Sequence, residues 1–462
     1  MKVNNNISAV ITNNQLLRTE DSLAKSMERL SSGLKINHSK DNPSGMAISN
    51  KMQAQIDGLN QASRNASDGT SVLETADGAL NVVTSMIQRM RELSVQAANG
   101  TNAQSEKEAI QLEIDKLKEE VDRISSSTEF NTKALLNGSL DNRVYAENAS
   151  RIQISEEVPS GIYEFTINSA AKQAQVSGAT IPATLANSGT VSINGYGVEL
   201  TAGMTQEEVY TALRDAAEIG EAYLTGGSSD PLVFNSTEYG AGASLTIEVS
   251  DTALAAELGL SGSTSALGTD ADVTLDTNSA FDTTASVKYE GNKLTITDVK
   301  GFEITMLLDE GVDATNDPEG NNGVILMNVT DIGPMVLQIG ANEGQQMSVK
   351  IPSCDTKCLY IDKVDVTTVN GAKRAISQLD AALTSVNKVR SALGAYSNRL
   401  ESATSSLDET SENMNSAISR ISDVDMAIEM TEYTRLNVLS QTATSALSQA
   451  NELPQMALQL LQ

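Results

Sequence analysis

Histidine, cysteine and aromatic residues are scarce in this sequence. Its 462 residues include no Trp, five Phe, ten Tyr, one His and two Cys. Because His38 is the only histidine, the H-E-x-x-H motif of zinc proteases is excluded, and Cys354 and Cys358 lack the further ligands that a zinc site needs. We therefore expect no enzyme activity and no cofactor. We interpret the cysteines as ordinary thiols, with a local disulfide as the alternative in an oxidising compartment.

Basic residues are also scarce, which bears on the partners of the chain. The formal net charge is −28, whereas nucleic acid requires a basic face. Lys and Arg number 15 against 17 Asp and Glu in residues 1–140, 9 against 31 in residues 141–360, and 8 against 12 in residues 361–462. The sequence predicts no nucleic-acid partner, nearly neutral ends that can pack against copies of themselves, and an acidic middle that faces water.

Long apolar runs are absent as well. The first residues, Met1-Lys-Val-Asn-Asn-Asn-Ile7, lack the apolar core of a secretory signal, and no stretch is long enough to span a membrane. We therefore expect no membrane partner. If the protein leaves the cell, we expect it to use another route.

Proline is rare, with eight residues in the chain, which leaves room for long helices. From residue 59 to residue 90, small or apolar residues recur at alternating spacings of three and four, the pattern of a coiled-coil seam: Leu59, Ala62, Ala66, Gly69, Leu73, Ala76, Leu80, Val83, Ile87 and Met90. This ladder predicts a helix over roughly 57–98 that ends at Asn99-Gly100. The same spacing predicts a second helix through 110–124 and a long one through 372–421.

The two extreme ends carry narrower apolar stripes. The N-terminal stripe contains Leu16, Leu23 and Leu30, and the C-terminal stripe contains Leu439, Ala443, Ala446, Ala450, Leu453, Ala457 and Leu460. Narrow stripes on Ser/Thr/Asn/Gln-rich helices give little stability to a lone helix, so we expect these ends to become ordered when partners cover them. An ordinary intramolecular bundle is the alternative, and it competes most strongly for residues 57–130 and 370–421.

The middle of the chain changes character. Alternating apolar runs bounded by Gly, Asn, Asp and Ser predict antiparallel strands at 163–167, 245–249, 293–297 and 347–351. A helix is predicted at Thr205–Glu218, where Thr205 and Glu208 form a capping box. The acidic loop at 309–319 departs from the spacing of an EF-hand, so we interpret it as a solvated turn rather than a calcium site. The predicted fold class is α+β, with mainly helical ends and an inserted β-rich outer region.

Several segments resemble the bacterial flagellin family. These are Leu30-Ser-Ser-Gly-Leu-Lys-Ile-Asn37 with Lys40–Ile48, Gln88–Thr101, Arg123–Asn131, Leu337–Gln345, Ile421–Ala427 and Asn437-Val-Leu-Ser-Gln441. The resemblance covers about 1–140 and 335–462 in the expected order. It implies a core helix and linker at 1–44, stalk helices and a hairpin at 45–170, an inserted outer region at 171–335, a C-terminal stalk at 336–421 and a C-terminal core helix at 422–462. A further division of the insert near residue 275 is left open.

The resemblance also implies partners and a location. Flagellins are exported unfolded through a type III apparatus and polymerise into the extracellular filament used for swimming. The implied partners are further copies of the chain, the export chaperone, the filament cap and hook-junction proteins, and the Toll-like innate immune receptor for flagellin. By motif position, Arg89, Leu93 and Glu113 match the receptor contacts of the family, and packing against the next subunit is the alternative use of that surface. A hook–filament junction protein and a surface adhesin are the alternative functions.

Overall fold

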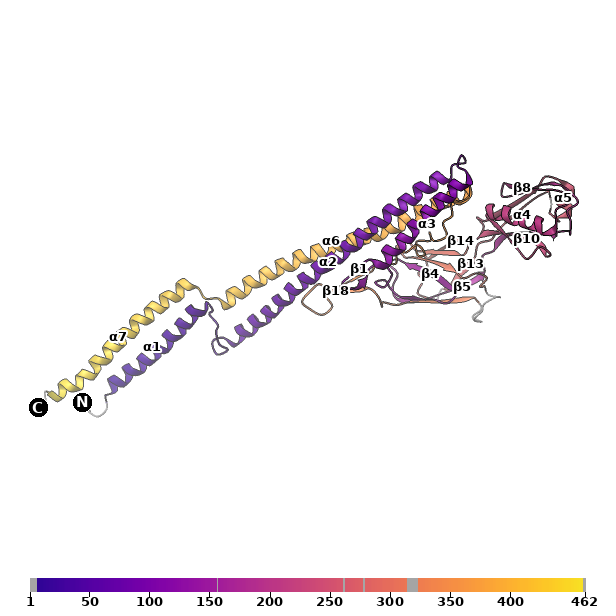
Figure 1. The fold of residues 1–462 in the computed structure, drawn as a ribbon. Coiled ribbons are helices and arrows are strands. Elements are labelled where there is room, and N and C mark those ends of the chain that lie inside the picture. The colour runs from indigo at the N-terminus through magenta and orange to yellow at the C-terminus, as the bar shows by residue number, and fades with distance from the viewer. Residues whose placement is uncertain (1–5, 156, 261, 277–278, 314–322, 460–462) are drawn as a thin grey trace. The chain divides into compact units, whose positions relative to one another are not determined.

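The computed structural model describes residues 6–155, 157–260, 262–276, 279–313 and 323–459. The chain forms two compact units, neither of which is continuous in the sequence. The first contains Met1–Thr70, Leu337–Met347 and Arg399–Gln462, and the second contains Ser71–Val336 and Ser348–Asn398. Helices make up the ends of the chain and antiparallel strands fill its middle, so the predicted α+β fold class is confirmed (Figure 1).

Two terminal helices belong to the first unit. α1 spans Ile7–Ser32 and α7 spans Met426–Gln459. The side chain of Asn6 accepts a hydrogen bond from Ala9 N at 3.2 Å and caps the start of α1. Gly33 ends α1 in the left-handed conformation, with φ of 74°. A side chain there would have open space but a strained backbone, so the glycine is required by φ rather than by packing.

Three long helices follow the predicted ladders. α2 spans Pro43–Ala97, α3 spans Gln104–Ser127 and α6 spans Val369–Ser422. Within the second unit α2 and α6 run antiparallel. Arg91 Nε donates to Asp380 Oδ1 at 2.5 Å, and Arg390 Nε donates to Asp77 Oδ1 at 2.8 Å.

The ladder predicted for α2 is confirmed by burial. All ten of its members, from Leu59 to Met90, are buried. The helix begins much earlier than the ladder, at Pro43, because proline suits the first helical turn and the polar residues after it need no apolar stripe to be helical. The predicted end is confirmed, since α2 stops at Ala97, just before Asn99-Gly100.

The middle of the chain is built from short strands. Their bounds are β1 Glu129–Phe130, β2 Lys133–Ala134, β3 Val144–Tyr145, β4 Ala149–Ile154, β5 Gly161–Ser169, β6 Gln173–Thr180, β7 Gly189–Ile193, β8 Tyr196–Leu200, β9 Ala222–Thr225, β10 Pro231–Tyr239, β11 Ser244–Val249, β12 Ser263–Leu267, β13 Asp272–Leu275, β14 Ser286–Glu290, β15 Lys293–Thr297, β16 Glu303–Leu308, β17 Val324–Val329, β18 Met335–Gln338 and β19 Gln346–Val349. The strands predicted at 163–167, 245–249, 293–297 and 347–351 correspond to β5, β11, β15 and β19.

Two apolar cores organise these strands within the second unit. One core is covered by the sheets ordered β12-β11-β7-β8 and β6-β10-β9, together with α4 (Gln206–Ile219) and α5 (Thr252–Glu257). The other lies against the sheets ordered β13-β5-β17-β3 and β14-β15-β16-β4. The capping box predicted for α4 is present, because Glu208 N donates to Thr205 Oγ1 at 3.4 Å and Thr205 N donates to Glu208 Oε2 at 2.8 Å.

Candidate functional site

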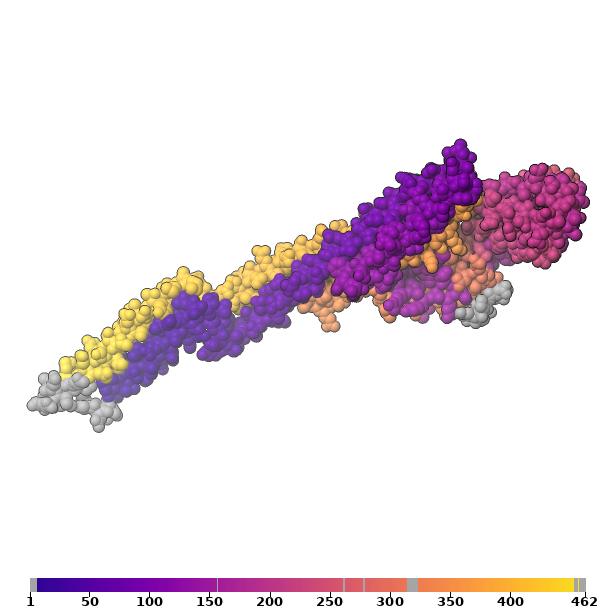
Figure 2. Space-filling model, in the orientation of Figure 1, coloured from indigo at the N-terminus to yellow at the C-terminus, as the bar shows by residue number. Residues whose placement is uncertain are grey.

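The terminal helices α1 and α7 form an antiparallel pair within the first unit. At one end, Val424 N donates to Gly33 O at 3.0 Å and Lys35 N donates to Ser422 O at 2.6 Å. At the other end, Asn6 Nδ2 donates to the carbonyl oxygen of Ala450 at 2.8 Å. Figure 2 shows the two helices side by side, α1 in indigo and α7 in yellow.

The seam between α1 and α7 is unusually polar. On α1 the buried residues are Leu16, Thr19 and Ser26, and on α7 they are Glu429, Leu436 and Ala450. Thr19 Oγ1 donates to Gln15 O within its own helix at 2.9 Å, whereas Ser26 Oγ has no hydrogen-bond partner among the described residues. The Glu429 carboxylate lies 3.8 Å from Arg29 Nη1. A seam of this composition stabilises the pair weakly, because buried polar groups contribute little and an unpaired one is costly.

Large apolar side chains lie on the parts of both helices that the seam leaves uncovered. They are Ile7, Val10, Ile11, Leu17 and Met27 on α1, and Met426, Ile428, Met430, Val438, Leu439 and Met456 on α7. Apolar side chains gathered on exposed helix faces mark a surface that another protein surface covers. The single chain therefore buries polar groups in the seam and exposes apolar ones outside it.

The predicted seam residues divide between these two surfaces. Leu16 and Ala450 are buried between the helices, while Leu23, Leu30 and Ala443 are half-buried. Leu439, at 42% exposed, and Ala446 lie on the uncovered surface. The side chains of Leu453 and Ala457, and all of Leu460, lie outside the described residues. Thr19, Ser26 and Glu429 were missed by the sequence reasoning, because an apolar ladder gives no signal for polar seam positions.

A second candidate surface lies where α2 faces α3. Arg89 Nη2 and Nε donate to Glu113 Oε1 at 2.8 and 3.1 Å, and Arg89 Nη1 donates to Glu92 Oε2 at 3.4 Å. The hydrogen bond that Arg89 donates to the Glu113 carboxylate raises the pKa of the Arg89 guanidinium. About half of each side chain of the Arg89–Glu113 pair is exposed, so the pair offers one fixed positive and one fixed negative group to a partner.

Leu93, the third residue matched to the receptor contacts, is buried. Its side chain is only 2% exposed. Its neighbours Met90 and Ser94 are fully buried as well, so the apolar stripe of α2 is wider here than one ladder. Leu93 therefore supports the surface from beneath.

The described residues give no sign of catalytic or metal chemistry. No group of three or more His, Cys, Asp and Glu side chains among them could hold a metal ion. Most of the acidic loop considered for calcium, residues 314–322, lies outside the described part of the chain. Cys354 and Cys358 are free thiols, and burial raises the pKa of each to about 12. No described helix is both long enough and apolar enough to cross a membrane.

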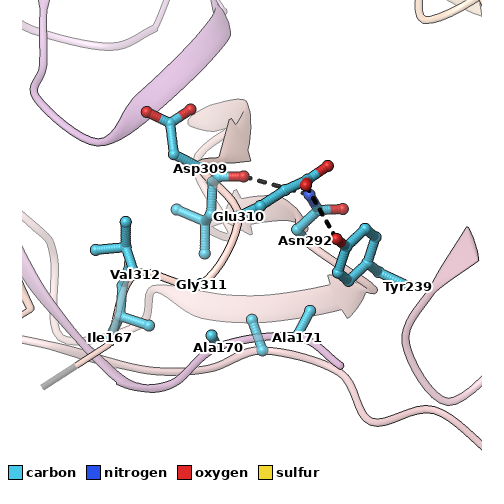
Figure 3. Close-up of a pocket in the computed structure, with 11 residues that line it drawn as sticks. Ile167, Ala170, Ala171, Tyr239, Asn292, Asp309, Glu310, Gly311 and Val312 are labelled. Atoms are coloured by element: carbon cyan, nitrogen blue, oxygen red, sulfur yellow. Dashed lines mark hydrogen bonds between the residues drawn. The ribbon is translucent and has the colours of Figure 1, made fainter. Parts of the chain in front are cut away.

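A small cavity beside β10 offers little room for a ligand. Its volume is about 10 Å³, and Tyr239 Oη donates to Glu310 Oε2 at 2.9 Å at its edge (Figure 3). This is enough space for about one water molecule. We regard it as a packing gap next to the apolar core.

Comparison with known proteins adds an independent finding. The model described as the bacterial flagellin N-terminal helical region matches residues 3–141, and the one described as the bacterial flagellin C-terminal helical region matches residues 376–461. A flagellin of Clostridium tyrobutyricum is 34% identical over 452 residues, covering 98% of this chain and 99% of its own length. Flagellin B of Vibrio anguillarum is 31% identical over 463 residues, covering 100% of this chain and 99% of its own length. A flagellin of Salmonella typhimurium is 31% identical over 511 residues, covering 99% of each chain.

Proposed function

The chain belongs to the bacterial flagellin family, and from that premise we propose that it assembles through the exposed faces of α1 and α7 into a filament that drives swimming. Like its flagellin relatives, it is a self-assembling structural subunit of the extracellular flagellar filament and not an enzyme. The observation that carries the proposal is the set of large apolar side chains left exposed on these two helices.

The energetics favour assembly over an isolated helix pair. Full burial of a Val, Leu, Ile or Met side chain is worth about 1.5–3 kcal/mol, and several such side chains on each helix lie exposed. Within one chain, the polar seam between α1 and α7 supplies little of this burial free energy. Neighbouring subunits can supply the missing burial, so ordering of the ends and polymerisation are coupled. Leu16, Leu23, Leu30, Ala443 and Ala450 then hold α1 to α7, while Leu439 and Ala446 meet another subunit.

A matched pair of charge substitutions tests this role. Leu439→Glu places a carboxylate on the exposed face of α7 without disturbing a buried contact of the single chain. Leu267→Glu makes the same chemical change at an exposed position on β12. After heating and seeded cooling, we expect electron microscopy to show filaments from Leu267→Glu and none from Leu439→Glu, with both monomers unfolding at the wild-type urea concentration.

Two outcomes would contradict the assembly proposal. Normal-length filaments from Leu439→Glu would show that this face is not covered by a neighbour. Normal-length filaments from a chain lacking residues 439–462 would show that the C-terminal stripe is dispensable. In contrast, a soluble and folded monomer from that truncation supports the proposal.

The same exposed surface supports proposals for other flagellar partners. The export chaperone would bind the C-terminal stripe of α7 before secretion and keep it from premature polymerisation. The filament cap and hook-junction proteins would meet α1 and α7 at the two ends of the polymer. Export in the unfolded state through a type III apparatus suits a helix pair whose polar seam costs little to open.

We place recognition by the Toll-like flagellin receptor at the Arg89–Glu113 surface. An exposed ion pair contributes at most about 1 kcal/mol to folding, so its removal leaves the monomer intact. We expect Arg89→Ala to weaken binding of the receptor ectodomain at least tenfold, about 1.4 kcal/mol. Arg214→Ala on α4 removes a similarly exposed arginine paired with Asp215 and serves as the control. Surface plasmon resonance on monomers measures the affinity of each variant for the receptor. Equal affinities of Arg89→Ala and Arg214→Ala would contradict a receptor site at the Arg89–Glu113 surface.

The domain division follows from this proposal. Residues 1–44 and 422–462 would form the filament core, residues 45–170 and 336–421 the stalk, and residues 171–335 the outer insert. Limited proteolysis of filaments tests it: the insert should be cleaved while the two ends stay protected by neighbouring subunits. Cleavage at the ends before the insert would contradict the division.

A further inference from the structure

Asparagine is followed directly by glycine at five places in the chain, and such a pair can react with itself. The glycine nitrogen has no side chain beside it, so it can reach the carbonyl carbon of the asparagine side chain. Residue 322 of one pair lies outside the described residues. The structure describes the other four pairs, which begin at Asn99, Asn137, Asn194 and Asn370.

The pair Asn99-Gly100 lies in the turn between α2 and α3, and both of its residues are exposed. Asn102 N donates to Asn99 O at 3.3 Å, which closes a four-residue turn with Gly100 at its second position. Within the described part of the chain, Gly100 N donates to no acceptor. The nitrogen that would attack is therefore open to water and to base.

The side chain of Asn99 is arranged for this attack. Thr101 N donates to Asn99 Oδ1 at 3.3 Å. A hydrogen bond to this oxygen polarises the amide carbonyl and stabilises the negative charge that the oxygen gains when a nucleophile adds to Cγ. Because Asn99 is exposed, the leaving ammonia is released directly into water.

Two of the other pairs are held by hydrogen bonds at their reacting groups. Asn194 Nδ2 donates to Gly220 O at 2.6 Å, and Asn194 Oδ1 accepts from Thr246 N at 2.8 Å. This side-chain amide is fixed at both ends and cannot turn toward the next nitrogen. The nitrogen that would attack Asn370 donates to Thr368 Oγ1 at 2.9 Å inside α6. Both pairs must open locally before they react.

The pair that begins at Asn137 resembles the Asn99 pair but is packed more tightly. Ser139 N donates to Asn137 Oδ1 at 3.0 Å, as Thr101 does for Asn99. However, a Cβ added to Gly138 would lie 3.2 Å from Ser353 Cβ, so this glycine is in contact with a distant segment of the chain. Ring closure rotates the asparagine against its glycine, and we expect this contact to slow the rotation.

We propose that Asn99 is a site of self-catalysed covalent modification. After base removes the amide proton of Gly100, a bond forms between Gly100 N and Asn99 Cγ. The bond from Cγ to Nδ2 then breaks, and Nδ2 takes up a proton and leaves as ammonia. Water opens the resulting five-membered imide at either carbonyl, which gives aspartate or isoaspartate at position 99. No oxidation or reduction takes place, and water is the only co-reactant.

The reaction changes both the charge and the length of the turn. Each event replaces a neutral amide by a carboxylate just beyond the end of α2, where the partial negative charge of the helix end makes a carboxylate unfavourable. In isoaspartate the main chain runs through the side-chain carbon, so the turn gains one backbone atom. This chemistry of an ageing subunit goes beyond the proposed filament function.

The test incubates the full-length monomer in heavy-oxygen water at mildly alkaline pH and follows each pair by peptide mapping with mass spectrometry. The same incubation in urea gives the rate of each pair in the unfolded chain. We expect folding to slow Asn99 by less than about threefold, and to slow Asn137, Asn194 and Asn370 at least about tenfold each. Heavy oxygen should appear in both aspartate and isoaspartate at position 99.

A matched pair of alanine variants tests the attacking nitrogen. Gly100→Ala places a Cβ beside that nitrogen, and this Cβ meets no other atom within 4 Å, so the fold is preserved. We expect it to slow the reaction at Asn99 at least about tenfold. Gly78→Ala on α2 also places its Cβ in open space and should react at the wild-type rate.

Several outcomes would overturn the proposal. One is an Asn99 that stays unmodified, and another is an equal slowing of all four pairs by folding. A rate for Gly100→Ala equal to that of Gly78→Ala would show that Gly100 N is not the nucleophile. Labelled aspartate without isoaspartate would show direct hydrolysis of the side chain in place of the imide route.

Discussion

The hydroxyl of Ser26 offers the sharpest test of how weakly α1 holds α7. Ser26 is 2% exposed, and its Oγ has no partner among the described residues. Ser26→Ala removes this group and leaves the helix otherwise unchanged. We expect the substitution to stabilise the helix pair, which is the opposite of the usual result for a change in a buried seam.

The magnitude follows from two contributions. Relief of an unpaired buried hydroxyl is worth about 1–3 kcal/mol, less the small dispersion energy of one oxygen atom. Alanine also favours the helix over serine by about 0.5 kcal/mol. Ser22→Ala is the matched control, because Ser22 is exposed on the same helix and its Oγ donates to Arg18 O at 2.9 Å. It should show only the change in helix propensity.

Hydrogen exchange of α1 amides in the monomer measures the effect where it arises. A gain of about 1–2 kcal/mol slows exchange roughly 5- to 30-fold, whereas Ser22→Ala should slow it about twofold. Ordering the pair in advance also lowers the cost of adding a subunit, so the critical concentration for polymerisation should fall. If Ser26→Ala exchanges faster than wild type, or no slower than Ser22→Ala, the Ser26 hydroxyl is not an unpaired group and the argument fails.

Two further predictions concern the second unit. Burial raises the pKa of Tyr163 to about 12, so its neutral form stabilises the fold fully below pH 10, and this contribution is lost as the pH rises through 12. Tyr163→Phe should cost about 1 kcal/mol at pH 7, where it loses the hydrogen bond to Pro159 O. Between pH 10 and 12 the wild type should lose about 2 kcal/mol of unfolding free energy that the variant does not lose. Urea unfolding at several pH values would measure this difference. Parallel curves of stability against pH for the two proteins would contradict it. Gly268→Ala should destabilise the fold by more than 1 kcal/mol, because the added Cβ would lie 2.5 Å from the carbonyl oxygens of Gly240 and Lys172. The control Gly242→Ala places its Cβ in open space and should be nearly neutral in the same urea assay.

Sequence periodicity predicted the helices well where one regular spacing continues over many turns. The ladder from Leu59 to Met90 keeps the alternating spacing of three and four residues throughout, and every member is buried. Capping chemistry located the start of α4 at Thr205 for a similar reason, since only a few residue types accept from a helix N-terminus. Local pattern and tertiary packing agree at these places.

The same reasoning was less informative for the candidate surfaces. Alanine is common on α7, so its sequence fits more than one face, and the face turned to α1 contains Leu436 rather than Leu439. The motif match that singled out Leu93 gave no signal for its burial, whereas the apolar stripe of α2 is wide enough to bury Leu93 beside Met90. Contacts between segments far apart in the sequence left no signal either, because the Arg151–Asp362 pair joins residues more than 200 positions apart.

The acidic excess of the middle of the chain explains where several basic side chains of α6 lie. Residues 141–360 carry 31 acidic and 9 basic side chains, so their carboxylates must find cations elsewhere or repel one another. Arg374 of α6 pairs with Glu221, and Lys388 of α6 pairs with Glu303. Glu221 also accepts from Thr368 Oγ1, just before the start of α6. Helix α6 therefore uses part of its small basic complement to hold the acidic region within the second unit, while α1 and α7 remain nearly neutral and can approach copies of themselves.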